Sequence, residues 1–148
     1  MFNKEINLKL STNFPRKKRQ VKIFPSEKQE SYALKKWADY HPICKKALLH
    51  IKNGGSLKSK IEGANFKRAG VKAGVSDYLL PYPVSPYHGL WIELKRREKS
   101  LCKVTDEQND WLVLMASFGY AVCVAYGCLE AINKIKEYLN GSKIIFHV

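Results

Sequence analysis

Acidic side chains are scarce in this sequence. Its 148 residues include 13 Asp and Glu against 26 Lys and Arg, which gives a formal net charge of +13 and a pI near 9.6. This imbalance favours a polyanionic partner over an acidic one. The basic residues are spread along the chain, and no single amphipathic basic helix concentrates them. Nucleic acid is therefore the expected partner, and a membrane surface is not.

Paired metal-binding residues are lacking as well. The four cysteines form no Cys-x-x-Cys pair, and the four histidines show no ligand spacing. These absences argue against a zinc site and favour reduced thiols in the core. No charged-then-apolar leader follows Met1, which predicts a cytoplasmic setting. We also expect no small-molecule organic cofactor.

One long uncharged run, residues 111–129, has the length of a membrane span. Gly119 and Gly127 interrupt it, and its part from Ala121 to Tyr126 is rich in β-forming residues. The run is therefore predicted to be the end of a helix followed by a buried strand, rather than a transmembrane helix.

The length and the 45% hydrophobic content fit one compact α/β domain. We expect a basic and flexible N-terminal arm over residues 1–25, a folded domain over 26–140, and a tail or edge strand over 141–148. Two capping boxes, Ser26 with Gln29 and Thr105 with Gln108, mark helix starts. The remaining pattern predicts helices over 26–41, 57–69, 105–118 and 129–139, and strands over 47–51 and 121–126.

Charged residues in an otherwise apolar strand give the strongest functional signal. Glu93 and Lys95 flank Leu94, so in a strand both project to one face. If the segment before the Pro-rich bend pairs with this strand, Asp77 reaches the same place. Two carboxylates beside a lysine suit a magnesium ion and phosphodiester hydrolysis. The alternative is a solvated face with a weak ion pair, but charges on a buried strand seldom lack a partner or a role.

Two further side chains are candidates for this site. Glu27 or Glu30 lies on the face of the first helix that carries Leu34, and one of them could join a metal site. Alternatively, Glu27 only stabilises the first helical turn, where an anion is favourable. Gln108 either serves its capping box alone or points toward the cation or its water.

Basic residues outside the site predict a surface for the nucleic-acid backbone, and the alternative is a solvated charged face. The candidate DNA-binding residues are Lys52, Asn53, Lys58, Lys60, Lys67, Arg68, Lys72, Arg96 and Arg97.

Taken together, these motifs resemble the virus-type replication-repair nuclease (VRR-NUC) domain, a branch of the PD-(D/E)xK nucleases. The resemblance spans Ser26 to Leu139. It is carried by a helix-borne glutamate, an Asn-Gly-Gly turn, a Gly-Val-Lys-Ala-Gly run leading to an aspartate, a Glu-x-Lys strand and a glutamine opening a helix. These stand here as Glu27, Asn53 to Gly55, Gly70 to Asp77, Glu93 to Lys95, and Gln108. Ser76 replaces the usual proline without removing a ligand.

The resemblance implies a mixed central β-sheet flanked by helices and Mg²⁺- or Mn²⁺-dependent DNA cleavage. It also implies a homodimer acting on branched DNA such as four-way junctions or flaps, in a bacterial cell or a phage-infected host. Asp77, Glu93, the Leu94 carbonyl and Glu27 would hold the metal, with Lys95 and Gln108 completing the catalytic set. Two alternatives stay open: a non-catalytic DNA-binding module with the same fold, and an RNA-processing enzyme.

Overall fold

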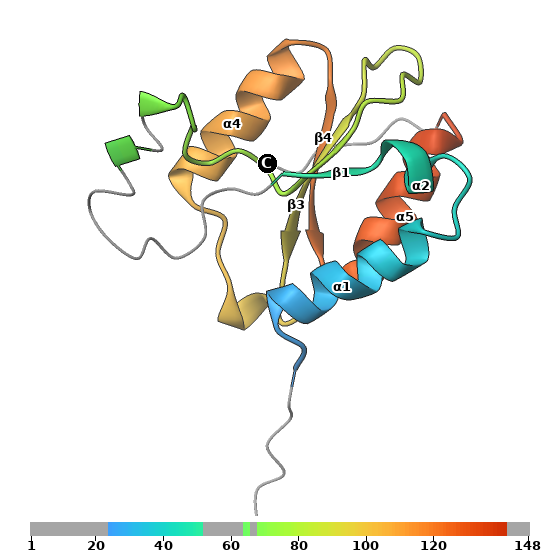
Figure 1. Cartoon of the computed structure of the whole chain (residues 1–148), viewed down its shortest axis with the longest axis horizontal. Helices are drawn as coiled ribbons and strands as arrows, with labels where there is room; N and C mark the ends of the chain where they lie inside the picture. The colour runs from blue at the N-terminus through green and yellow to red at the C-terminus, as the bar shows by residue number, and fades with distance from the viewer. Residues whose placement is uncertain (1–23, 52–63, 66–67, 142–148) are drawn as a thin grey trace, which may run out of the picture.

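The computed structural model describes residues 24–51, 64–65 and 68–141. Its centre is a four-stranded mixed sheet with the strand order β1-β2-β3-β4 (Figure 1). The strands are β1 (Leu49–His50), β2 (Tyr78–Leu80), β3 (Leu90–Lys95) and β4 (Ala121–Tyr126). The helices are α1 (Glu27–Ala38), α2 (Cys44–Ala47), α4 (Asp106–Ser117) and α5 (Cys128–Leu139), with a 3-10 turn, η1 (Lys99–Leu101), before α4. The α/β class with a mixed sheet is confirmed.

The strands pair in two ways. The pairs β1–β2 and β2–β3 are antiparallel, with His50 opposite Tyr78 and Tyr78 opposite Ile92. The pair β3–β4 is parallel, with Glu93 opposite Val124. A parallel pair needs a crossover connection, and here η1 and α4 supply it. This crossover carries the start of α4 back past the end of β3.

Both predicted capping boxes are present, because Ser26 and Thr105 each exchange hydrogen bonds with the glutamine three residues later. Helix α4 and strand β4 fall almost where the sequence predicts them. Helix α1 ends at Ala38 rather than near His41, since a turn forms at residues 39–40 ahead of Pro42. Those boundaries confirm the capping signals as the most reliable local information in the sequence.

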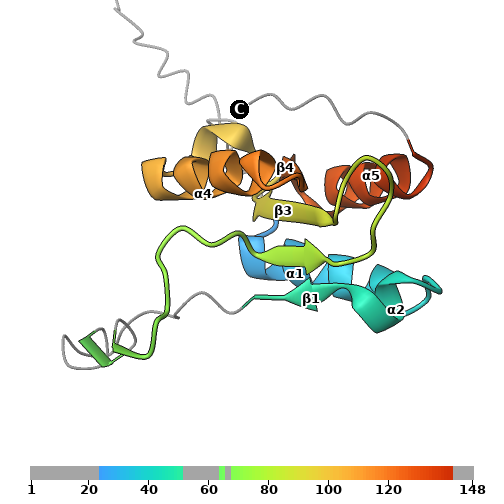
Figure 2. The same cartoon turned by 90° about the horizontal axis from the view of Figure 1, so that it is seen from above.

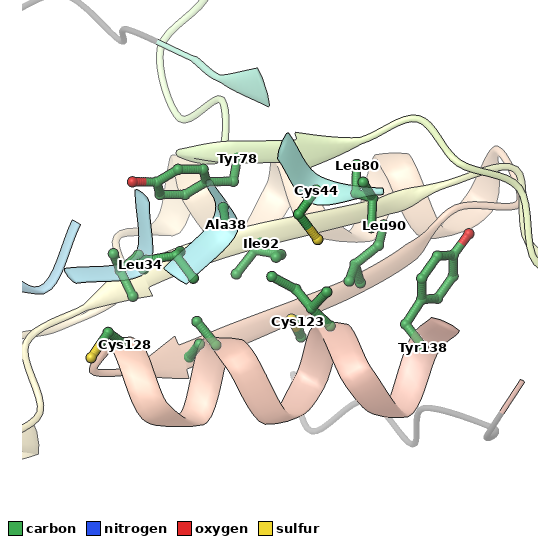
Figure 3. Packing of buried hydrophobic residues seen from close by; sticks show 14 of the residues in the cluster. Leu34, Ala38, Cys44, Tyr78, Leu80, Leu90, Ile92, Cys123, Cys128 and Tyr138 are labelled. Atoms are coloured by element: carbon green, nitrogen blue, oxygen red, sulfur yellow. The ribbon is translucent and has the colours of Figure 1, made fainter. Parts of the chain in front are cut away.

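Helices cover the two faces of the sheet differently (Figure 2). On one face, α1 and α5 enclose the larger core, in which the labelled Leu34, Leu80 and Ile92 meet (Figure 3). On the other face, α4 covers a smaller cluster formed by Trp91, Leu112, Met115 and Val122. Strand β3 is buried along its whole length, so every side chain on it has protein on its own side.

Some expectations need correction or lie outside the described residues. The strand predicted over 47–51 is only Leu49–His50, because Cys44–Ala47 forms the unpredicted helix α2. Of the helix predicted over 57–69, Ala64, Asn65 and Arg68 are helical, while residues 57–63 and 66–67 lie outside the description. The N-terminal arm up to residue 23 and the tail from 142 also lie outside it. The uncharged run over 111–129 is divided among α4, β4 and the start of α5, and among the described residues no helix is long and apolar enough to cross a membrane.

Candidate active site

Glu93 and Lys95 form a buried ion pair on β3. The Lys95 Nζ lies 2.9 Å from Glu93 Oε1, and the two side chains are only 7% and 1% exposed. Strand alternation puts both on the α4 side of the sheet, while Ile92 and Leu94 point into the larger core. Burying an ion pair this far from water carries a large desolvation penalty. The Glu93–Lys95 pair is therefore not explained by a gain in stability alone.

Gln108 connects both members of this pair. Its Oε1 accepts hydrogen bonds from Lys95 Nζ at 2.9 Å and from the Thr105 backbone N–H at 3.0 Å, while its Nε2 donates to Glu93 Oε1. The capping box therefore does not exclude a role in the site. One side chain performs both, because the first turn of α4 lies beside the end of β3.

Asp77 reaches the same place from the residue before β2. Its Oδ2 accepts a hydrogen bond from the Leu94 backbone N–H at 2.9 Å. In a strand, the N–H and C=O of one residue point to the same neighbour, so the Leu94 carbonyl also faces the edge where Asp77 lies. The Lys95 carbonyl faces the opposite way, toward Gly127 of the β4 side. Asp77, Glu93 and Lys95 are therefore brought together as the sequence predicts.

A close backbone contact fixes the loop that leads to Asp77. Gly74 has φ +77°, and a Cβ placed there would lie 2.2 Å from the Glu107 carbonyl oxygen in α4. Only glycine satisfies both the left-handed backbone and this approach. The loop that carries Asp77 is thus fastened to the helical turn that carries Gln108. No local pattern reveals this contact, because Gly74 and Glu107 are far apart in the sequence.

The carboxylates of this site share an unfavourable electrostatic environment. Burial raises the pKa of Glu93 to about 7, and the charge of Asp77 adds to this shift while Lys95 opposes it. Burial also raises the pKa of Asp77, against the Leu94 hydrogen bond and Lys95. The molecule thus holds two acids in positions that disfavour their ionised forms.

The structure separates the two helix-borne glutamates. The N-terminal end of α1 lies beside the C-terminal end of β3 (Figures 1 and 2), and Glu27 there interacts electrostatically with Lys95 and Asp77. Partial burial of its carboxyl group is the main cause of the raised pKa of Glu27, although most of the residue's surface is accessible to solvent. Glu30 is buried elsewhere, with Oε2 accepting from the Cys128 N–H at 2.9 Å and Oε1 3.6 Å from Arg97 Nε. Only Glu27 faces the site.

The donor set fits a divalent cation. Glu93 Oε2 is buried and has no hydrogen-bond partner in the described structure, which is costly unless something positive satisfies it. Two carboxylates and a carbonyl suit magnesium, which keeps several of its waters. Within residues 24–51, 64–65 and 68–141, no group of three or more His, Cys, Asp or Glu is placed to hold a metal. Asp77, Glu93 and Glu27 thus do not form such a three-residue group, and their roles as metal ligands stay predictions.

The predicted DNA-binding residues are only partly visible. Arg68 and Lys72 are exposed, and Arg96 lies close enough to Glu27 to affect its charge. Arg97 is half-exposed. Its side chain packs against Gly127, and its Nε lies 3.6 Å from Glu30 Oε1. The others, Lys52, Asn53, Lys58, Lys60 and Lys67, lie outside the described residues.

Sequence reasoning missed His50 as a neighbour of the site. Its ring stacks on Tyr78, with centroids 4.9 Å apart and planes at 28°, and its electrostatic interaction with Asp77 partly opposes the rise that burial causes in the pKa of Asp77. The Tyr78 hydroxyl shares a 2.6 Å hydrogen bond with Ser31 of α1. The signal was available only through strand pairing, because His50 and Tyr78 are far apart in the sequence.

Comparison with solved structures identifies the family. A structure described as a VRR_NUC domain protein matches with a TM-score of 0.69 and 26% identity, over 82% of this chain and 98% of that one. This likeness supports a VRR-NUC domain. No family model matches the sequence, and no curated protein matches it. The structural likeness supports a nuclease-family domain.

Proposed function

We propose that this VRR-NUC protein is a divalent-metal-dependent DNA endonuclease that cleaves branched DNA. The observation that carries the proposal is the convergence of Asp77, Glu93 and Lys95, with a buried carboxylate oxygen left without a partner. Burying two carboxylates and a lysine together lowers the stability of the fold. A bound cation and a phosphate would offset this cost. The +13 net charge supports a polyanionic substrate.

Each side chain has a defined part in this proposal. Asp77 and Glu93, with the Leu94 carbonyl, would hold Mg²⁺ or Mn²⁺. The bound ion supplies Lewis-acid stabilisation of the scissile phosphate and lowers the pKa of a water. Lys95 orients the attacking water and offsets negative charge that develops on the phosphoryl oxygens.

Gln108 has a supporting part. Its hydrogen bond to Lys95 Nζ and its place in the Thr105 capping box restrict the lysine to one position. Glu27 adds negative charge at the edge of the site, where it would attract the cation. Precise placement of such groups is what accelerates phosphoryl transfer.

Asp77→Asn tests the proposal. We expect Mg²⁺-dependent cleavage of labelled four-way junctions and flaps to fall by at least about a thousandfold, with DNA affinity kept or raised because a repulsive charge is gone. Asp110→Asn, the same change at an exposed carboxylate on α4, is the matched control and should cleave normally. Duplex and single-stranded DNA, each with and without Mg²⁺, complete the substrate panel.

The outcome also decides between candidate functions. Salt-sensitive binding without any Mg²⁺-dependent cleavage by the unmodified protein would favour the non-catalytic DNA-binding module instead. Normal cleavage by Asp77→Asn would show that the site is misassigned. The homodimer is a separate proposal, and sedimentation equilibrium of the whole protein tests it.

A further inference from the structure

A regular stripe of basic and aromatic side chains runs along the outside of α1. Lys28, Tyr32, Lys36 and Tyr40 follow one another at intervals of four residues, the last in the turn after the helix. Residues four apart lie on one helical face, so Lys28, Tyr32 and Lys36 form a single row, and Tyr40 follows it in the turn. We call Lys28, Tyr32, Lys36 and Tyr40 the α1 stripe.

The α1 stripe faces away from the core. The buried residues of α1 are Glu30, Leu34 and Ala38, which have the same spacing but are offset by two positions. At about 100° per residue, an offset of two places the rows on nearly opposite sides of the helix. Tyr32 is accordingly 62% exposed and Tyr40 85% exposed. Neither ring therefore contributes much to packing the domain.

The alternation of charge and aromatic ring has a chemical meaning. Lys28 Nζ lies 5.6 Å from the centroid of the Tyr32 ring, so an ammonium and an aromatic face are presented side by side. Duplex DNA offers its phosphates but hides its bases, whereas a single strand offers both. A row that alternates cations with rings matches a single strand, on which bases stack and phosphates pair with lysine.

The position of the α1 stripe relates it to the candidate active site. It starts one residue after Glu27, at the end of α1 that lies beside the end of β3 (Figure 1). Within α1, Lys28 and Lys36 are about 12 Å apart along the helix at 1.5 Å per residue. A strand held on the stripe would therefore have one end close to Asp77, Glu93 and Lys95.

We propose that the α1 stripe binds the single-stranded arm of a branched DNA substrate and leads it to or from the catalytic centre. The proposal rests on the proposed function for its choice of DNA. It assigns the base-stacking role to Tyr32 and Tyr40 and the phosphate-binding role to Lys28 and Lys36. A chain with this stripe would prefer flaps to blunt duplexes, because only flaps carry an unpaired arm.

Fluorescence anisotropy of a labelled oligodeoxythymidylate, measured in EDTA so that no cleavage occurs, tests the proposal. Base stacking contributes about 1–3 kcal/mol per base, so the double variant Tyr32→Ala/Tyr40→Ala should weaken binding by about tenfold or more. Tyr32→Phe/Tyr40→Phe keeps the ring faces and should retain most of the affinity. Phe118→Ala removes an aromatic side chain that is 57% exposed at the end of α4 and is the matched control.

The salt dependence of single-strand affinity tests the phosphate-binding role of Lys28 and Lys36. Lys28→Ala/Lys36→Ala should reduce the slope of log affinity against log salt by about one or two, whereas Lys136→Ala on α5 should not. Thermal unfolding confirms that each variant is folded. Unchanged single-strand affinity in the double tyrosine variant, or an equal loss for blunt duplex, would overturn the proposal.

Failure of this proposal is distinguishable from failure of the proposed function. If the double tyrosine variant binds single strands normally while the unmodified protein cleaves DNA with Mg²⁺, the stripe is wrong and the nuclease stands. If the unmodified protein shows no cleavage and the tyrosine variant still loses single-strand affinity, the stripe stands and the nuclease does not.

Discussion

The fold buries two glutamates in different surroundings. Glu93 lies near the C-terminal end of β3, and Glu30 of α1 lies against the start of α5. Glu30, 2% exposed, accepts a hydrogen bond from the first N–H of α5 through Oε2, and its Oε1 makes no hydrogen bond in the described structure but lies 3.6 Å from Arg97 Nε. Glu93, fully buried, is shared by Lys95 and Gln108 through one oxygen and leaves the other without a partner in the described structure.

The unbonded oxygen of Glu30 thus faces a cation of the protein, whereas the unbonded oxygen of Glu93 faces none among the described residues. Glu30 supplies the acceptor that α5 lacks, because Gly127 at its N-cap has no side chain to offer. Burial, and after it the charge of the nearby Asp77, raises the pKa of Glu93 to about 7. A protein tolerates such repulsion where the function repays its cost in stability.

The largest effect expected is on catalysis, from the same chemical change made at the two glutamates. Glu93→Gln should lower Mg²⁺-dependent cleavage of a flap substrate by at least about a thousandfold, since it removes the charge of a proposed metal ligand. Glu30→Gln keeps an acceptor for the Cys128 N–H and should stay within a few-fold of the unmodified rate. Single-turnover cleavage at saturating Mg²⁺ measures both. Equal losses in the two variants would mean that the comparison does not separate catalysis from structure.

Much of the site could be predicted from the sequence because it depends on local rules. Strand alternation places Glu93 and Lys95 on one face, and a capping box places Gln108 in the first turn of a helix. These relations involve residues a few positions apart.

What the sequence could not supply is contact between distant segments. It left Glu27 and Glu30 as alternatives, since both lie in the first turns of α1, and only the position of α5 shows which one is already engaged. It also gave no sign that Gly74 touches Glu107 or that His50 stacks on Tyr78. Such contacts are set by tertiary packing, which local periodicity does not encode.

A smaller effect, on stability, is expected at Glu30. Glu30→Ala leaves the Cys128 N–H without its acceptor and removes the 3.6 Å contact with Arg97. The expected loss is about 1–3 kcal/mol in the free energy of unfolding, measured by urea titration. Glu137→Ala removes a half-exposed carboxylate paired with Lys134 and should change stability by less than about 1 kcal/mol. If Glu30→Ala lost no more stability than Glu137→Ala, Glu30 would not be a residue that stabilises the fold.

The smallest effect is a gain in stability at the site itself. Asp77→Asn keeps an oxygen that can accept from the Leu94 N–H but removes the charge that raises the pKa of Glu93. Without divalent metal, we expect a gain of about 0.5–1 kcal/mol near pH 7, in line with other relieved functional sites. This gain should accompany the loss of cleavage.

The pH dependence of this gain identifies its cause. Asp77 and Glu93 both have a folded-state pKa above the ordinary value. Their contribution to stability is therefore fully present below the unfolded pKa values near 4 and is lost as the pH rises toward about 7. The advantage of Asp77→Asn should thus be small at pH 4, grow as the pH rises to 7, and shrink again when Mg²⁺ is added to the unmodified protein. Urea titrations at several pH values, with and without Mg²⁺, measure it. An advantage that is equal at pH 4 and pH 7 would show that the two acids do not repel each other in the folded protein.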